Sequence, residues 1–289
     1  MVEIRTATAG YFPAVPAAVD DSPVKIQQRL GFDFVVGHHT SWKDGIFGTL
    51  SSHENVHSES LPYPDGCLKI TGELTANQLL YDETDLDSTN RLLVVPDPYT
   101  LNCHASGTYF ETELECLAAI TDYLYQEISL APPHAIVCIL APGIVHAPPP
   151  DGMDARCSAA IDRLCAASEA PVILAGFGDG YTEKVHAHLL DADITAMGYD
   201  LVRASEHSRE LILEYGSTDQ IALGLLDTGT GVGIGTERLE ATIADFVTGF
   251  GVQTFSNVYA MPAGPLSALP WNALEPLLLP LAELNEQIN

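Results

Sequence analysis

The sequence predicts an α/β fold: a single (β/α)8 TIM barrel over residues 1–289, with a small hairpin excursion after the second strand. Eight apolar runs alternate with helical segments, which is typical of a parallel sheet wrapped by helices. The 289 residues contain no linker-like tract, and barrels of this length form one domain. Several apolar runs end in Gly or Asp, and barrel sites lie at the carboxyl ends of strands.

The first two barrel units are short. Residues 4–10 predict the first strand, and the prolines that follow prevent an immediate helix. Residues 24–30 allow two helical turns, and residues 32–37 predict the second strand. The segment 46–88 is rich in Ser, Gly, Pro and Asp, so we expect the excursion there, with one hairpin strand at 67–74.

The next two units are longer. Residues 91–97 predict the third barrel strand, and 98–106 read as its exit loop. A strongly amphipathic helix is expected over 110–130, followed by the fourth strand at 134–142. The proline-rich segment 143–152 then leads to the next helix.

That helix is expected over residues 153–168, with Asp151 near its start. The fifth to eighth strands are predicted in VILAGF, ITAMGY, IALGLLD and VQTFSNVYA, and the last segment is expected to be helical after Pro280. Polar residues lie at the ends of three successive predicted strands, in the segments 176–180, 197–205 and 221–229; we call these segments the polar tips. We therefore expect them to converge on one rim that carries the function.

Acidic residues dominate the charge. The 39 Asp and Glu against 12 Lys and Arg give a net charge of −27, which argues against nucleic acid as a partner. The acidic residues are spread over the whole chain, and salt at about 1 M screens their repulsion to roughly 3 Å. We expect a halophilic protein. The alternative is an ordinary acidic domain, because net charge reports on solubility and not on fold.

Cysteines and apolar stretches bear on location. The six cysteines form no CxxC pair, so we expect them to be reduced and mostly structural. The N-terminal residues lack the pattern of a signal peptide, and prolines interrupt the apolar stretches well before they reach bilayer length. The sequence therefore predicts a cytoplasmic protein with no membrane partner.

Two motifs, HENVH and a glycine-rich segment, match functional patterns but can also be explained as ordinary loops or turns. HENVH at 53–57 matches the zinc-protease pattern, which requires a helix, but its Ser-, Gly- and Pro-rich surroundings favour a chance match in a loop. DTGTGVGIGTERLE at 227–240 follows a strand and opens a helix with Thr236 as the expected N-cap. It is compatible with a phosphate cradle, but a flexible turn over the barrel mouth is the favoured interpretation.

A third candidate is a rim metal site. Histidine and cysteine follow strands two, three and four, and together they offer zinc ligands at His38, His39, Cys103, His104 and His146. Such side chains in loops are more often solvated or hydrogen-bonded than ligating. On the same rim, Asp200, Arg203 and Asp227 can form an ion-pair cluster.

Six segments, in order along the chain, resemble the cobalamin-independent methionine synthase family: TAGYFPAV, VVGHHTSWKDGIF, VVPDPYTL, GFGDG, YDLVR and LGLLDTG. The resemblance covers most of the chain and is nearest to the family's N-terminal zinc-free barrel and its small free-standing archaeal forms. It implies an archaeal, barrel-shaped member of a methyltransferase family (5-methyltetrahydropteroyltriglutamate-homocysteine methyltransferase) in methionine biosynthesis.

The sequence departs from the family at its catalytic residues. In the catalytic barrel, a zinc that activates homocysteine thiolate is held after strands five, six and eight by His-x-Cys, Glu and Cys. The corresponding residues here are Ala175, Gly176 and Phe177, Gly198 or Tyr199, and Ala260 or Met261. None of these can hold zinc as a charged or imidazole ligand. The family's Asp-Glu-Pro after strand four is Leu140, Ala141 and Pro142, and its glutamate after strand two is His38.

The resemblance with its departures implies a barrel without its own catalytic zinc, and no cofactor is expected unless a relocated rim site binds zinc. It would bind a folate-type or other small ligand, or assist a separate catalytic methionine synthase barrel. The ligand-binding candidates are His38, His39, Trp42, Asp44, Tyr99, Asp200, Arg203 and Asp227. Trp42 offers a stacking surface and Arg203 a clamp for a glutamate carboxylate. Catalytic residues are not assigned. Two alternatives stay open: an independent methyltransferase with a relocated rim metal, and a phosphate-ligand-binding barrel enzyme.

Overall fold

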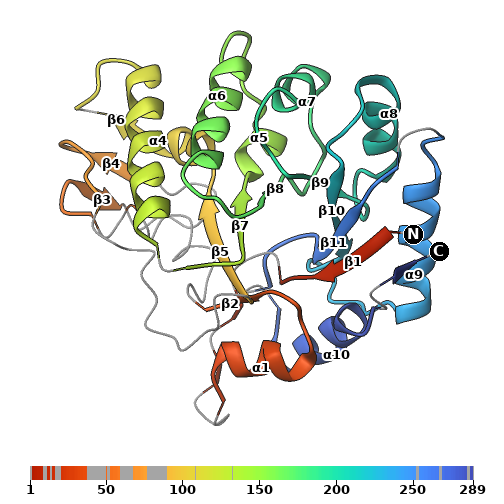
Figure 1. Cartoon of the computed structure of the whole chain (residues 1–289). Coiled ribbons are helices and arrows are strands. Elements are labelled where there is room, and N and C mark those ends of the chain that lie inside the picture. The colour runs from red at the N-terminus through yellow and green to blue at the C-terminus, as the bar shows by residue number, and fades with distance from the viewer. Residues whose placement is uncertain are drawn as a thin grey trace.

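The strands of the main sheet lie at the centre of the molecule in the computed structural model (Figure 1). The structure describes residues 2–8, 12–13, 15–16, 21–37, 50, 53–58, 68–76, 90–107, 109–131, 133–251, 254–266, 269–284 and 287–288. The strands of this sheet are β1 (Val2–Thr6), β2 (Val35–Val36), β5 (Arg91–Pro96), β7 (Ile136–Leu140), β8 (Val172–Ala175), β9 (Ala196–Asp200), β10 (Gln220–Leu226), β11 (Asn257–Pro262) and β12 (Gln287–Ile288).

Strand pairing gives the sheet its barrel topology. Among the described residues the order is β12-β1-β11-β10-β9-β8-β7-β5-β2, with parallel pairing throughout except between β12 and β1. A parallel bridge between Ala7 and Phe34, where the Phe34 N–H donates to the Thr6 carbonyl at 3.0 Å, joins β1 to the β2 end of the row. The row therefore curls back on itself, which confirms the predicted α/β barrel.

Helices cover the outside of this sheet, with α4, α6, α7 and α8 along one side (Figure 1). The described helices are α1 (Pro23–Leu30), α3 (Pro98–Cys103), α4 (Glu113–Leu130), α5 (Pro142–His146), α6 (Asp154–Cys165), α7 (Glu183–Leu189), α8 (Ser205–Tyr215), α9 (Thr236–Thr248) and α10 (Trp271–Ala282). Local signals set their ends. Ser22 caps α1 and Gly31, with φ 99°, ends it, while Thr112 and Glu115 form a capping box at α4.

The predicted excursion is present. Strand β3 (Val56–Ser58) pairs antiparallel with β4 (Leu68–Ile70), and β6 (Ala105–Gly107) adds a third, parallel strand. HENVH runs through a turn into β3, so its histidines do not lie on a helix and the metalloprotease alternative is excluded. His53 is buried, and its Nδ1 and Nε2 lie 3.1 and 3.0 Å from the backbone nitrogens of Asn55 and Thr75, of which a neutral imidazole can accept one N–H.

Three local predictions were wrong. The supposed exit loop 98–106 contains α3 and β6, because Asp97 caps α3 and Pro98 occupies its first position. The N-cap of α9 is Gly235, and Thr236 is its first helical residue. Helix α10 begins at Trp271 and includes both of its prolines, because it buries Leu274, Leu277, Leu278 and Leu281. Burial of each of these four leucines contributes about 2 kcal/mol. Together they offset the cost of the two prolines, which is roughly 3 kcal/mol each.

The barrel interior is filled by side chains. Every residue of β5, β7, β8 and β9 is buried, as expected for parallel strands covered on both faces. Inside, the rings of Phe34 and Tyr259 lie 6.2 Å apart between centroids. Such a packed interior confines any ligand to the mouth at the strand ends. Among the described helices, none combines the length and apolar character needed to cross a bilayer.

Candidate functional site at the barrel mouth

Asp200 ends β9 at the mouth and holds the loop that follows. Its Oδ1 accepts the backbone N–H groups of Val202 at 2.8 Å and Arg203 at 2.9 Å, and its Oδ2 accepts from Arg203 Nη1 at 3.1 Å. The carboxylate is buried, and this burial raises the pKa of Asp200, opposed by the bonds and the charge of Arg203. The Asp200–Arg203 ion pair and these hydrogen bonds therefore hold the end of β9 and the following loop together.

The guanidinium of Arg203 is held in place by hydrogen bonds along one of its edges. Nη1 also donates to the Ala263 carbonyl at 3.1 Å, and Nη2 lies 3.9 Å from Asp227 Oδ1. The side chain keeps 38% of its surface exposed. The guanidinium is thus anchored from behind while part of it faces solvent at the mouth, a geometry suited to a planar anion such as a carboxylate.

Asp227 ends the neighbouring strand and organises the glycine-rich turn. Its carboxylate accepts the Gly229 N–H at 2.9 Å and the Thr230 hydroxyl at 2.9 Å. The Thr230 hydroxyl, followed by the Gly229 N–H, lowers the pKa of Asp227. The carboxylate therefore stays ionised and directs the turn, which matches the favoured reading of this segment better than a phosphate cradle does.

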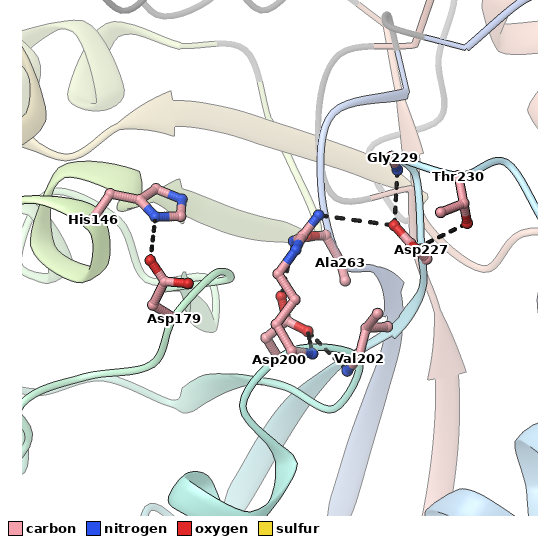
Figure 2. A network of polar contacts seen from close by, with 9 residues as sticks. His146, Asp179, Asp200, Val202, Asp227, Gly229, Thr230 and Ala263 are labelled. Atoms are coloured by element: carbon pink, nitrogen blue, oxygen red, sulfur yellow. Dashed lines mark hydrogen bonds and ion pairs between the residues drawn. The ribbon is translucent and has the colours of Figure 1, made fainter.

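His146 and Asp179 form a second polar pair at the mouth. His146 ends α5, and its Nδ1 lies 3.2 Å from Asp179 Oδ2 in the loop after β8. In Figure 2, this pair lies on one side of the view and Asp227 on the other, with Asp200 and Ala263 between them. The three predicted polar tips therefore do converge on one rim.

The glycines of GFGDG make this convergence possible. A Cβ at Gly176 would overlap the Tyr181 hydroxyl, one at Gly178 would overlap the His146 ring, and one at Gly180 would approach His207 Cδ2 at 2.8 Å. Gly178 and Gly180 also have φ values of 141° and 90°, which favour glycine. Each glycine thus leaves room for a ring against the loop backbone.

Phe177, in the same loop, covers the strand tips inside the mouth. A Cβ at Gly198 would lie 3.2 Å from Phe177 Cε1, and one at Gly224 would lie 3.1 Å from its Cδ1. Ala175, Phe177 and Met261 are all buried. Ala175 and Met261 are therefore apolar and buried, and the Phe177 ring lies against Gly198 and Gly224.

Sequence reasoning missed Asp97, the residue that follows β5 and caps α3. Its buried carboxylate accepts the Tyr99 and Thr100 N–H groups at 2.9 and 3.0 Å and the Thr100 hydroxyl. That hydroxyl accepts the Gly143 N–H at 2.8 Å, which ties the β5 tip to α5. Burial, opposed by these hydrogen bonds, raises the pKa of Asp97 to about 6. The available signal was an Asp before Pro at a strand end, which is a helix start.

The predicted ligand residues fall into three groups. Asp200, Arg203 and Asp227 come together as one cluster. Tyr99 instead lines a separate cavity of about 440 Å³ beside Cys103, between α3, α4 and the start of α6, and its hydroxyl donates to the Ala147 carbonyl at 2.9 Å. The remaining candidates lie outside the described residues: His38, His39, Trp42 and Asp44.

The rim metal hypothesis concerns partly the same residues. Within the part of the chain that the structure describes, no group of three or more His, Cys, Asp or Glu side chains is placed to hold a metal ion. His146 is engaged with Asp179, and burial raises the pKa of the Cys103 thiol, which disfavours a thiolate ligand. A relocated site that uses His38 or His39 stays a hypothesis.

Comparison with known proteins supports the fold. The sequence matches no protein-family model and no curated protein. A B12-independent methionine synthase from Shewanella sp. W3-18-1, solved with selenomethionine, superposes with a TM-score of 0.73 at 13% identity over 98% of this chain and 96% of its own. A putative B12-independent methionine synthase from Listeria monocytogenes superposes with a TM-score of 0.65 at 13% identity, over 96% and 98%. The chain is thus similar in fold to these barrels along nearly its whole length.

Proposed function

We propose that this chain is a methionine-synthase-like barrel that binds a small carboxylate ligand at its mouth, with Arg203 as the carboxylate clamp. One observation carries the proposal: a guanidinium anchored by Asp200 and the Ala263 carbonyl, yet 38% exposed at the strand ends. An arginine held in this way loses little conformational freedom when it binds a carboxylate.

Two ligand classes share this chemistry. The Shewanella neighbour was solved with selenomethionine, an amino acid with an α-carboxylate. A folate-type ligand with a glutamate tail also presents carboxylates, and Trp42 is the proposed stacking surface for its ring. His38, His39, Asp44 and Asp227 remain proposed mouth contacts. Tyr99 fits this role less well, because it lines the separate cavity.

We further propose that the chain acts without zinc at the family position. Ala175, Gly198 and Met261 supply no thiolate, imidazole or carboxylate, and the Phe177 ring lies against the Gly198 position. Elemental analysis should find no stoichiometric zinc. One zinc per chain that disappears on His38→Ala or His146→Ala would instead support an independent methyltransferase with a relocated metal.

Calorimetric titration tests the clamp. We expect L-methionine or a glutamylated 5-methyltetrahydrofolate to bind, and Arg203→Ala to weaken binding at least tenfold, because a charge-assisted bidentate contact is lost. Arg209→Ala is the matched control, since Arg209 pairs with Asp245 on the outer helices and should leave binding unchanged. Equal binding by wild type and Arg203→Ala would refute the clamp, and binding of sugar phosphates alone would favour the phosphate-ligand alternative.

A second candidate is an accessory role for a separate catalytic barrel, favoured by the missing zinc ligands. In that case the purified catalytic barrel should form methionine faster when this chain is added, and Arg203→Ala should reduce the increase. If the two proteins neither bind nor affect the rate, the stand-alone ligand-binding role is retained. The chain covers 96% and 98% of the two neighbours' own lengths, which supports that stand-alone role.

The proposal of a halophilic, archaeal and cytoplasmic origin rests on the charge of −27 and on the resemblance. A halophilic chain should unfold cooperatively as salt falls below about 1 M, because screening of the acidic surface is then relaxed. Circular dichroism across a potassium chloride series measures this. Unchanged stability over the series would favour an ordinary acidic domain.

A further inference from the structure

We propose that His146, oriented by Asp179, is the proton acceptor and donor of the barrel mouth and acts on the ligand whose carboxylate Arg203 holds. The inference rests on the proposed function for its ligand. It names a residue pair that neither the ligand candidates nor the metal hypothesis explains. Asp179 is the positioning residue of this pair, and His146 is its reacting group.

The hydrogen bond fixes where the imidazole carries its proton. His146 Nδ1 lies 3.2 Å from Asp179 Oδ2, and an ionised carboxylate only accepts hydrogen bonds. Nδ1 therefore bears the hydrogen and Nε2 keeps its lone pair. With 48% of the His146 side chain exposed, Nε2 is accessible to a ligand in the mouth.

The position of the ring is built into the backbone. Gly178 precedes Asp179, and with φ 141° and no Cβ it leaves the space that the His146 ring occupies. A Cβ at Gly178 would also lie 3.1 Å from Val145 Cγ2. The loop that supplies the carboxylate therefore also forms the seat of the imidazole, while the Asp179 side chain itself is 76% exposed.

The pair and the clamp are neighbours across the mouth. Phe177, next to Gly178, and Ala263 both lie against Gly224, with Phe177 Cδ1 and Ala263 Cα at 3.1 and 3.0 Å from its Cβ position. The Ala263 carbonyl accepts from Arg203. Figure 2 shows His146 and Asp179 facing the side on which Ala263 and Asp200 lie. His146 and Arg203 therefore border one mouth, across which the proposed ligand would extend.

This arrangement suits a carboxylate ligand with an ionisable N–H, O–H or S–H group a few atoms from its carboxylate, such as an amino acid. The proton leaves that group, whose bonding electron pair stays on the ligand heteroatom, and forms an N–H bond at His146 Nε2. The resulting imidazolium is stabilised by the Asp179 carboxylate, and the reverse step returns the proton.

A second His–Asp pair provides an internal control. On the outer helices α6 and α7, His188 approaches Asp154 through Nε2 at 3.7 Å, beyond hydrogen-bond range. Its tautomer is therefore not fixed by the carboxylate.

Long-range ¹H–¹⁵N correlation spectra of the ¹⁵N-labelled protein test the orientation without any ligand. At about pH 8.5, where an ordinary imidazole is neutral, we expect His146 to carry its hydrogen on Nδ1 and His188 to show no such preference. The His146→Gln spectrum assigns the signal. Asp179→Ala should abolish the Nδ1–H form and Asp179→Asn should retain it in part. A His146 signal dominated by Nε2–H, or unchanged in Asp179→Ala, would overturn the inference.

Calorimetry of L-methionine binding in buffers of different ionisation enthalpy tests the proton transfer. At about pH 6.5, wild type and His188→Gln should exchange protons with buffer on binding, whereas His146→Gln should bind within severalfold of wild type and exchange none. Unchanged exchange in His146→Gln would overturn the proton-transfer role. If wild type binds neither L-methionine nor the folate probe, the proposed function fails, and the tautomer measurement still decides whether His146 is held by Asp179.

Discussion

The loops after β5 and β9 use the same hydrogen-bond pattern with a different third partner. In each, an Asp lies at the strand end, as the last residue of β9 or the first after β5, and its carboxylate accepts from the backbone N–H groups two and three residues later and from the side chain three residues later. For Asp97 that side chain is the Thr100 hydroxyl, and for Asp200 it is the Arg203 guanidinium. Both carboxylates are buried, and burial raises the pKa of both.

The third partner decides what each loop can do. Thr100 brings no charge, and within the described part of the chain no cation pairs with the buried Asp97; the Thr100 hydroxyl serves to join the β5 tip to Gly143. Arg203 brings a charge that opposes the rise in the pKa of Asp200 and remains partly exposed. One local structure therefore serves as a structural lock in one loop and as a proposed ligand clamp in the other.

The largest expected effect follows from breaking the lock. Asp97→Ala should lower the free energy of unfolding by about 4 kcal/mol, because two buried N–H groups and the Thr100 hydroxyl lose their acceptor. Urea unfolding in high salt measures the change. Thr100→Val, which keeps the carboxylate and its two N–H bonds, should cost less, and equal losses in the two variants would contradict the central role given to Asp97.

The pH dependence separates the two carboxylates. The pKa of Asp97 is raised from 3.8 to about 6, so its contribution to stability is full below pH 3.8 and is lost as pH rises through about 6. The loss is roughly 3 kcal/mol. The difference in unfolding free energy between wild type and Asp97→Asn should therefore change by this amount between these pH values, and Asp200→Asn should change less, because Arg203 opposes burial.

Wild type must be compared with Asp97→Asn because the buried His186 changes the unfolding free energy with pH in the opposite direction. Burial, followed by the charge of His207, lowers the pKa of His186 to about 4. Its contribution is present above the ordinary value of 6.5 and is lost as pH falls towards 4. Wild type alone would show the two trends partly cancelled. A flat difference between wild type and Asp97→Asn would contradict the raised pKa of Asp97.

A smaller effect is expected from the clamp. Arg203→Ala should destabilise the fold by about 2 kcal/mol, less than for a fully enclosed ion pair, because Arg203 is 38% exposed. Arg203→Lys keeps the charge but gives up the planar fork, so its loss should be intermediate. Thermal unfolding of the three proteins at one salt concentration measures this order. An Arg203→Ala protein as stable as wild type would show that Asp200 needs no counter-ion.

The smallest effect concerns the seat of His146. Gly178→Ala should cost about 1 kcal/mol of stability through its positive φ, and it should displace the His146 ring. Gly152→Ala is the matched control, because Gly152 also has a positive φ of 88° but no heavy atom within 4 Å of its Cβ position. The two variants should lose similar stability, while only Gly178→Ala loses the His146 Nδ1–H signal. An unchanged signal would argue against the seat.

The barrel could be predicted from sequence because parallel strands buried on both faces leave continuous apolar runs, such as those at β5, β7 and β8. The Asp200, Arg203 and Asp227 cluster was predictable because strand ends meet at one rim. The Asp97 lock was missed because a residue that starts a short helix looks like part of a loop. The His146–Asp179 pair was missed because the end of α5 and the loop after β8 are 33 residues apart in the sequence and meet where Gly178 leaves room for the His146 ring.

The Phe177 ring has a consequence for how this barrel can change over evolutionary time. A Cβ at Gly198 would lie 2.6 Å from the Leu174 carbonyl oxygen and 3.2 Å from the ring, and one at Gly224 would lie 3.0 Å from Ala263 and 3.1 Å from the ring. A metal-ligating side chain at either position would therefore meet backbone as well as the ring. Removing the ring would leave a void beneath the mouth, at a cost of about 3 kcal/mol or more, and the backbone contacts would remain. Each single step towards a metal-ligating residue at these two positions is therefore unfavourable.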